Sequence, residues 1–134
     1  MIQRRSVLTG AAALLLLPLA RPARAMIDYT PGMVDARLAA GETVLVDFWA
    51  SWCSTCRAQS RVIEDLRAEN PAYDAAISFV RVDWDEHATG DLSQRLEIPR
   101  RSTLVLLSED RELGRIVADT RAPEIRALLD LALA

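Results

Sequence analysis

Two cysteines, three positions apart, are the residues of this sequence with the clearest capacity for chemistry. They enclose the segment Cys53-Ser54-Thr55-Cys56 and are the only cysteines among 134 residues. A β-branched and aromatic run, residues 43–50, precedes them, and apolar residues at helical spacing follow them. The pair is therefore expected where a buried strand turns into a helix. There, both sulfurs lie on one face of the first helical turn, close enough for an S–S bond.

The start of a helix favours the reactive form of such a pair. Its unpaired N–H groups and partial positive charge stabilise a thiolate, which is the attacking species in disulfide exchange. Cys53, at the start, is predicted to be the nucleophile, and Cys56, one turn deeper, to resolve the mixed disulfide. An inert structural disulfide is the alternative. A protein-only zinc site is disfavoured, because zinc takes four ligands and the chain has no second Cys-x-x-Cys and no pair of histidines.

An acidic residue inside the apolar run is the next chemical group. Asp47 lies six residues before Cys53 in a segment that is otherwise apolar. Burial disfavours the charged form and raises the pKa of a carboxyl group. A carboxylate held in this way is able to accept the proton of Cys56 as that thiol attacks. The other interpretation is a solvated carboxylate at a strand end.

The remaining segments alternate between strand-like and helix-like patterns. Strands are expected at 26–30, 43–50, 77–82, 103–107 and 112–118, and helices from residue 33 to Gly41 and at 53–70, 91–96 and 122–133. This order predicts one α/β domain over residues 26–134, with a central mixed β-sheet flanked by helices.

Residues 1–25 are expected to be an export signal. Arg4 and Arg5 form its charged end, residues 10–17 form an apolar stretch too short to span a bilayer, and Ala23-Arg24-Ala25 is a cleavage site. The charged end is similar to the twin-arginine export motif, although an ordinary secretory signal or a permanent anchor remain alternatives. We expect cleavage after Ala25 and a bacterial periplasmic location.

The charge of the rest of the chain excludes one class of partner. Residues 26–134 hold 12 basic and 19 acidic residues, a net charge of −7, and every basic residue is an arginine. This net negative charge argues against nucleic-acid binding.

The segment around the cysteines identifies a family resemblance. Residues 44–56, which read VLVDFWASWCSTC, closely resemble the active-site segment of thioredoxins, including a tryptophan, Trp52, directly before Cys53. The likeness extends more weakly from about residue 30 to residue 134. It implies a thioredoxin-like fold and thiol–disulfide exchange with no cofactor beyond the cysteine pair. It also implies that Asp47 takes the proton from Cys56, and that Trp52 shields the disulfide and contacts the substrate.

One loop departs from that family. Thioredoxins carry a cis-proline opposite the cysteines, just before a strand that starts with Thr. Counting back from the hairpin strand puts Ser102 in this place with Arg101 before it, whereas the other alignment uses Pro99 and a two-residue insertion. We favour Ser102 and expect a trans peptide bond before it, because a cis bond there costs about 2.5–4 kcal/mol. Arg101 and Ser102 then join Trp52 as expected substrate-binding residues with a narrower range of clients.

Three charged or titratable groups near this region have open roles. Arg81 falls where thioredoxins often place a lysine near the buried acid, so it either pairs with Asp47 or faces solvent. Arg100 and Arg101 either attract an acidic partner or form a plain exposed pair. His87, the only histidine, is expected to be a surface residue, and no metal ligand is assigned.

These observations predict a monomeric, periplasmic thiol–disulfide oxidoreductase that reduces client disulfides. Its expected partners are exported cysteine-containing proteins and a membrane thiol–disulfide electron donor. The alternative is a Cu(I) metallochaperone that uses Cys53 and Cys56, since soft thiolates suit Cu(I). A third possibility is an adaptor in which the cysteines only stabilise the fold.

Overall fold

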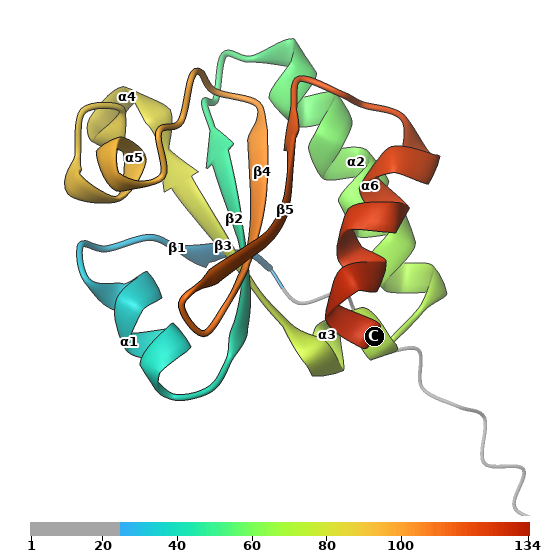
Figure 1. Ribbon diagram of the computed structural model, residues 1–134. Helices are drawn as coiled ribbons and strands as arrows, with labels where there is room; N and C mark the ends of the chain where they lie inside the picture. Colours follow the sequence, from blue (N-terminus) through green and yellow to red (C-terminus); the bar gives the residue numbers. More distant parts are fainter. Residues whose placement is uncertain (1–24) are drawn as a thin grey trace, which may run out of the picture.

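The computed structural model describes residues 25–134 and shows one mixed sheet between two layers of helices (Figure 1). The strands are β1 (Ile27–Asp28), β2 (Thr43–Trp49), β3 (Ile77–Asp83), β4 (Thr103–Ser108) and β5 (Arg111–Val117). The helices are α1 (Met33–Ala39), α2 (Ser54–Glu69), α3 (Ala72–Ala76), α4 (Trp84–His87), α5 (Asp91–Arg95) and α6 (Ala122–Asp130), followed by a 3-10 turn, η1 (Leu131–Leu133). The predicted α/β class and mixed sheet are confirmed.

The sheet places β2 at its centre. The strand order is β1-β3-β2-β4-β5, in which β1, β3 and β2 run parallel and β4 and β5 run antiparallel to their neighbours. A strand with a partner on each side and helices over both faces is buried throughout, which explains the nearly unbroken apolar run in β2. Residues Val44–Phe48 of this strand are all buried, Asp47 included.

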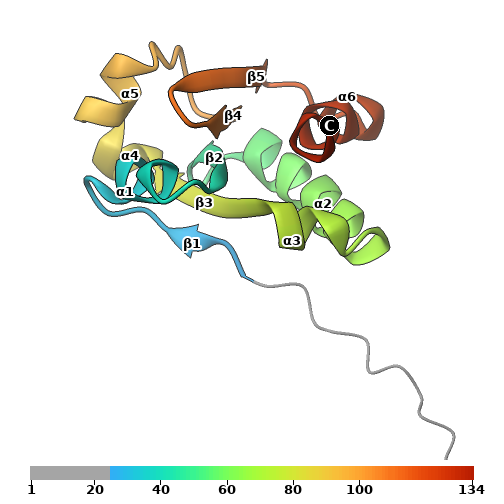
Figure 2. The ribbon, with the colours of Figure 1, turned by 60° about the horizontal axis from the view of Figure 1, so that its bottom comes forward.

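Each face of the sheet has its own apolar core. Helices α2, α3 and α6 cover one face, and α1, α4 and α5 cover the other (Figures 1 and 2). Leu45 packs with Ile63 of α2 and Ile125 of α6, whereas Val44 and Val46 pack in the second cluster with Val34 of α1. Because side chains alternate along a strand, Asp47 shares the face of Leu45 and points toward the α2 side.

Two short helices were not expected from the sequence. Helix α3 directly follows the proline that ends α2, where the side chain of Asn70 accepts a hydrogen bond from the Ala72 backbone N–H at 3.1 Å. Helix α4 begins after Asp83, whose carboxylate accepts from the N–H of Asp85 at 3.0 Å. The first is a turn made by an asparagine side chain, and the second is a helix N-cap; such local hydrogen bonds stabilise single helical turns that have no clear apolar period of their own.

The export signal predicted for residues 1–25 lies outside the described residues, except for Ala25. Within residues 25–134, no helix combines the length and the apolar character that crossing a membrane requires.

Candidate active site

Four strands have an end at the same end of the sheet. Apart from Asp47, which lies within β2, the predicted site residues come from the loops that follow or precede these strand ends. In the register of the sheet, Trp49 at the end of β2 pairs with Asp83 at the end of β3. Because β4 is antiparallel to β2, its first residue, Thr103, lies opposite Phe48 and also opposite Val117 at the end of β5. The topology therefore brings the start of α2, the start of α4 and the loop before β4 to one place.

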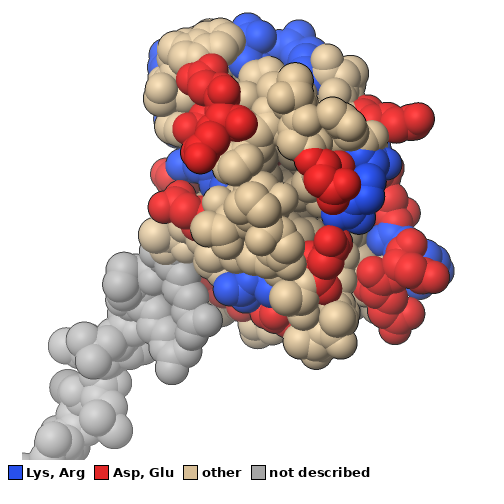
Figure 3. All heavy atoms as spheres, turned by 90° about the vertical axis from the view of Figure 1, so that its left-hand side faces the viewer, with Lys and Arg blue, Asp and Glu red and all other residues tan. Residues whose placement is uncertain are grey.

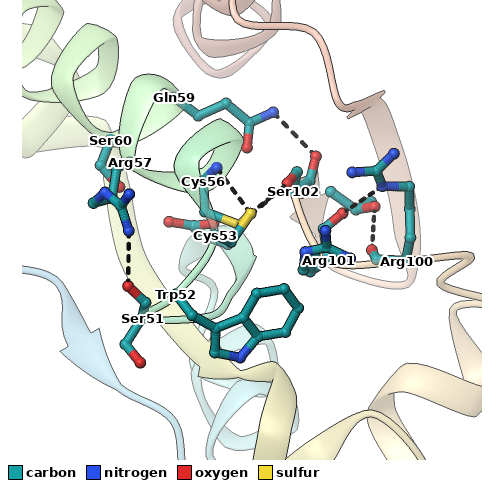
Figure 4. Close-up of a disulfide and its surroundings, with 12 residues drawn as sticks. Ser51, Trp52, Cys53, Cys56, Arg57, Gln59, Ser60, Arg100, Arg101 and Ser102 are labelled. Carbon is teal, nitrogen blue, oxygen red and sulfur yellow. Dashed lines mark hydrogen bonds between the residues drawn. A yellow bond between two sulfur atoms is a disulfide. The ribbon is translucent and has the colours of Figure 1, made fainter.

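The cysteine pair stands where the sequence predicts it. Cys53 is the N-cap of α2, with φ −93° and ψ 110°, and its sulfur accepts a hydrogen bond from the backbone N–H of Cys56 at 3.1 Å. The two residues form a disulfide, with their Cα atoms 5.3 Å apart. Cys53 is 3% exposed and Cys56 is completely buried, so an attacking client reaches Cys53 first. Figure 4 shows the pair between the turn of α2 and the loop that carries Ser102.

Ser102 lies directly against both sulfurs. Its Oγ is 3.2 Å from Cys53 Sγ and 3.1 Å from Cys56 Sγ (Figure 4). No peptide bond in residues 25–134 is cis, so the expected trans bond before Ser102 is confirmed. The residue has φ 63°, a left-handed conformation that is uncommon for a side chain other than glycine. The alignment that placed Ser102 opposite the cysteines thus agrees with the geometry.

Gln59 holds the backbone of Ser102 and was not predicted as a site residue. It is fully buried on α2, and its Nε2 donates to the carbonyl of Ser102 and to that of Asp119, both at 3.0 Å. The N–H of Ser102 donates to the Phe48 carbonyl at 2.8 Å, and its carbonyl also accepts from the Ala118 N–H at 2.8 Å. The available sequence signal was a polar residue three positions after Cys56, on the face that α2 turns to the sheet.

Asp47 is buried without a hydrogen-bond partner on either carboxylate oxygen within the described residues. Loss of solvation raises its pKa to about 7, although the positive charge of Arg81 acts in the opposite direction. Arg81 Nε lies 3.6 Å from Asp47 Oδ2, an ion pair that is too long for a hydrogen bond. The alternative of a solvated strand-end carboxylate is therefore wrong, and the carboxyl group is poised to change charge near neutral pH.

Arg81 faces inward, toward Asp47, and is held there by two further contacts. Its Nη2 donates to Ser60 Oγ on α2 at 2.9 Å, and its guanidinium lies 4.5 Å from the centroid of the Trp49 ring. Of the two roles left open for Arg81, pairing with the buried acid is the one that the geometry confirms. Its side chain remains 26% exposed, so one end of the ion pair reaches solvent.

The exposed side chain of Trp52 lies next to the disulfide. It is 55% exposed, its Nε1 donates to the carboxylate oxygens of Asp85 at 2.9 and 3.0 Å, and the guanidinium of Arg101 lies 4.4 Å from its ring centroid. Arg101 Nε is buried and has no hydrogen-bond partner in residues 25–134. The residues predicted to bind substrate, Trp52, Arg101 and Ser102, are thus neighbours around the sulfurs. Asp85 joins them because β3 ends at the same edge.

Other arginines border the same end of the molecule. Arg57 Nη1 donates to the Ser51 carbonyl at 2.9 Å, and Arg100 Nε donates to the Arg101 carbonyl at 3.1 Å. Viewed from the side of α1, α4 and α5, acidic side chains are spread over the face and basic side chains gather at its upper edge, the end where α2 begins (Figure 3). These arginines share this end of the molecule with acidic side chains, among them Asp85, which accepts from Trp52.

His87 makes its aromatic contact with Tyr29, at the β1 side of the sheet. Its side chain is 16% exposed and its ring packs edge-on against Tyr29, with 4.9 Å between centroids, so it is more buried than the surface position we expected. In the part of the chain that the structure describes, no three His, Cys, Asp or Glu residues are grouped as a metal site would require.

Comparison with known proteins gives one consistent result. The thioredoxin family model matches residues 27–130. Thioredoxin-1 of Saccharomyces cerevisiae is 32% identical over 88 residues, which cover 66% of this chain and 80% of that protein. Thioredoxin of Staphylococcus aureus is 26% identical over 106 residues, which cover 79% and 96%.

Solved structures agree with the sequence relatives. The crystal structure of Trxlp from Edwardsiella tarda EIB202 matches with a TM-score of 0.69 and 26% identity, over 78% of this chain and 98% of that one. Thioredoxin of Malassezia sympodialis has the same fold, with a TM-score of 0.64 and 22% identity over 84% and 95%. With its Cys-x-x-Cys pair at the start of α2 in this fold, the chain belongs to the thioredoxin family and is a thiol–disulfide oxidoreductase.

Proposed function

We propose that this chain is an exported enzyme that reduces disulfides of other exported proteins in the bacterial periplasm. The observation that carries the proposal is the position of Cys53, which caps α2 beside the exposed Trp52 while its partner Cys56 is completely buried. A client disulfide reaches the slightly exposed Cys53 first, and the sulfur of Cys56 lies deeper. This is the arrangement that two-step disulfide exchange needs.

The reaction begins from the reduced pair. The Cys53 thiolate attacks one sulfur of the client disulfide, forms a mixed disulfide and releases the first client thiolate. Cys56 then loses its proton and attacks Cys53 Sγ, which restores the internal disulfide and releases the second client thiolate. Two electrons pass from the cysteine pair to the client, so a thiol donor must reduce the pair again before the next cycle.

Asp47 is the proposed proton acceptor for Cys56. Its pKa of about 7 keeps a fraction of the carboxyl groups ionised near neutral pH and still allows proton uptake. Arg81, 3.6 Å away, favours the ionised form and so limits how far burial raises that pKa. The resolving step is expected to accelerate as pH rises through about 7.

Trp52, Arg101 and Ser102 are the proposed client-binding residues. The Trp52 ring offers an exposed apolar surface next to Cys53, and Arg101 lies over that ring with a positive charge. A client whose cysteine is followed or preceded by an acidic residue fits this combination. Such a preference also agrees with the narrower range of clients expected from the Ser102 loop.

Location and partners are proposed from the N-terminal sequence. Residues 1–25 combine two arginines, a short apolar stretch and a small-residue cleavage site, which together support export and cleavage after Ala25. In the periplasm, the thiol donor must deliver electrons from across the membrane, so we propose a membrane thiol–disulfide protein as the donor. We also propose that the mature domain acts as a monomer.

The reduction potential of the Cys53–Cys56 pair tests the direction of the reaction. The mature protein is equilibrated against defined glutathione buffers, and the oxidised fraction is measured. A value near that of thioredoxin, about −270 mV, supports client reduction, whereas a value near about −120 mV makes the protein an oxidant and contradicts the proposed direction.

Cys53→Ser distinguishes the oxidoreductase from its rivals. Loss of disulfide exchange with stability retained supports the enzyme. Tight Cu(I) binding by the unmodified protein, lost in the variant, supports a metallochaperone that uses the same two sulfurs. Loss of stability alone supports an adaptor whose disulfide is structural.

A further inference from the structure

The hydroxyl of Ser102 occupies a position between the two redox sulfurs. Its Oγ lies 3.2 Å from Cys53 Sγ and 3.1 Å from Cys56 Sγ, and these sulfurs are its only hydrogen-bond partners in residues 25–134. A serine hydroxyl carries one hydrogen, so it donates to one acceptor at a time. The strength of the hydrogen bond from this hydroxyl therefore depends on whether the sulfur that accepts it is neutral or charged.

The oxidation state of the pair changes that acceptor. A disulfide sulfur is neutral and accepts weakly. The reduced pair presents a thiolate at the start of α2, and hydrogen bonds to charged acceptors are about twice as strong as those between neutral groups. The same hydroxyl at the same place thus interacts more favourably with the reduced protein than with the oxidised protein.

The backbone of Ser102 fixes the hydroxyl in this position. The residue is completely buried, its N–H is bonded to Phe48 of β2, and its carbonyl accepts from Ala118 and Gln59. These bonds tie the residue to the central strand, to the end of β5 and to α2. A donor held by three elements loses little conformational entropy when the thiolate forms, and it is shielded from competing water.

We propose that the Ser102 hydroxyl donates its hydrogen to the thiolate of the reduced pair and thereby raises the reduction potential of the Cys53–Cys56 disulfide. The proposal rests on the assignment of this pair as the redox centre. Ser102 touches the reacting atoms, so its effect is on the chemistry of exchange as well as on the shape of the loop. Gln59 acts through Ser102 and is a positioning residue.

Two substitutions separate the hydroxyl from the backbone strain. Ser102→Ala removes the hydroxyl and keeps a side chain at φ 63°, whereas Ser102→Gly removes the hydroxyl and relieves the strain of that conformation. Ser93→Ala is the matched control. Ser93 is also a buried serine, 3% exposed, but its Oγ donates to the His87 carbonyl at 2.8 Å, away from the sulfurs.

The measurement is the oxidised fraction of each protein after equilibration in a series of glutathione redox buffers, with circular dichroism as a check on folding. For Ser102→Ala and Ser102→Gly, we expect the equilibrium to move about tenfold or more toward the disulfide. This corresponds to a potential about 30 mV more negative, at 29.6 mV per tenfold change. Ser93→Ala is expected to keep the potential of the unmodified protein.

The outcomes are separable. Equal shifts in the two Ser102 variants support the proposal, because they share only the loss of the hydroxyl. An unchanged potential in folded Ser102→Gly overturns it, and a shift confined to Ser102→Ala also overturns it, since strain alone then explains the effect. If the unmodified protein itself fails to exchange with glutathione, the proposed function fails first.

Discussion

At the scale of single residues, the site contains a buried carboxyl group, Asp47, whose ionised form is costly to the fold. Asp47 is fully buried, lacks a hydrogen-bond partner within the described chain and has only a 3.6 Å ion pair with Arg81. An ionised carboxylate in such a place destabilises the fold, because its lost hydration is incompletely replaced. The proposed proton transfer from Cys56, and not a gain in folding stability, therefore accounts for an aspartate at this buried position.

The pH dependence of stability should reveal this destabilisation. Because the pKa of Asp47 is about 7 in the folded chain, against 3.8 in the unfolded chain, the folded chain holds the proton more tightly. The contribution of Asp47 to the free energy of unfolding therefore falls as pH rises from about 4 to about 7. Asp47→Asn should match the unmodified oxidised protein near pH 4 and exceed it at pH 8, by at most on the order of 4 kcal/mol. Urea unfolding at both pH values measures the difference.

Asp119→Asn provides a control of opposite sign. Hydrogen bonds from Arg121 lower the pKa of Asp119 to about 2, so its contribution is present above the unfolded pKa and is lost as pH falls. This variant should gain nothing at pH 8. If the free energy of unfolding of Asp47→Asn depends on pH in the same way as that of the unmodified protein, the pKa of Asp47 is not raised in the folded chain.

Client selection belongs to the same scale. Arg101→Gln removes the positive charge over Trp52 and leaves the sulfurs untouched. For a peptide disulfide with glutamate beside its cysteine, kcat/KM should fall by up to about fivefold, because ion pairs near the surface contribute about 0.2–1 kcal/mol. The same peptide with glutamine is the control substrate. An equal fall for both peptides would show that Arg101 does not read client charge.

At the scale of elements, the strands and most helices, including the short α5, followed from their sequence patterns, while α3 and α4 did not. The helix predicted at 53–70 is α2 (Ser54–Glu69), with Cys53 as its N-cap. This prediction succeeded because the apolar spacing, the residue at the start and the proline that ends the helix all indicated the same segment. Helices α3 and α4 begin at local hydrogen bonds to the side chains of Asn70 and Asp83, and such bonds are not visible in an apolar period. Asp85 was missed because its position at the site depends on the pairing of β3 with β2, which brings the end of β3 beside the end of β2. Gln59 was missed although its place on the buried face of α2 could be read from its spacing after Cys56.

Leucine side chains of α6 and η1 leave little room over Gly114 of β5. A Cβ added to Gly114 would meet Leu128 Cδ1 and Leu131 Cδ1, each at 3.0 Å. Gly114→Val should therefore lower the free energy of unfolding by about 1–3 kcal/mol, as overpacking does elsewhere. Thermal and urea unfolding measure this loss.

A double variant identifies the cause. Gly114→Val combined with Leu128→Ala should lose less stability than the sum of the two single losses, because the smaller side chain leaves room for the valine. Strict additivity would mean that contact between β5 and α6 is not what the valine disturbs.

At the scale of the whole molecule, a parallel half and an antiparallel half of one sheet bring four strand ends together at the start of α2. Residues far apart in sequence, such as Cys53 and Ser102, meet because β4 runs antiparallel to β2. The sequence identified Cys53, Cys56 and Asp47 from local pattern alone. The contact of Ser102 with both sulfurs and the inward turn of Arg81 depend on this global register, which no local pattern contains.

Export of the whole chain is testable without the folded domain being altered. Changing Arg4→Lys and Arg5→Lys in the full-length precursor keeps the positive charge but removes the pair of arginines that a twin-arginine route requires. In a bacterial host, the variant should stay in the cytoplasm, whereas the unmodified precursor should yield a periplasmic protein that begins at Met26. Cell fractionation and intact-mass analysis provide the measurement, and unchanged export of the variant would favour the ordinary secretory route.

The most direct test of the account is to capture the mixed disulfide that it requires. Reduced Cys56→Ser, which lacks the resolving thiol, is incubated with a small disulfide-bonded client peptide and analysed by intact mass and fragment mapping. We predict one peptide joined to Cys53 through a stable disulfide. We predict no adduct on a folded Cys53→Ser protein, because its remaining cysteine, Cys56, is completely buried and lies against Ser102. An adduct that forms equally on both variants, or on neither, would contradict Cys53 as the nucleophile of a two-step exchange.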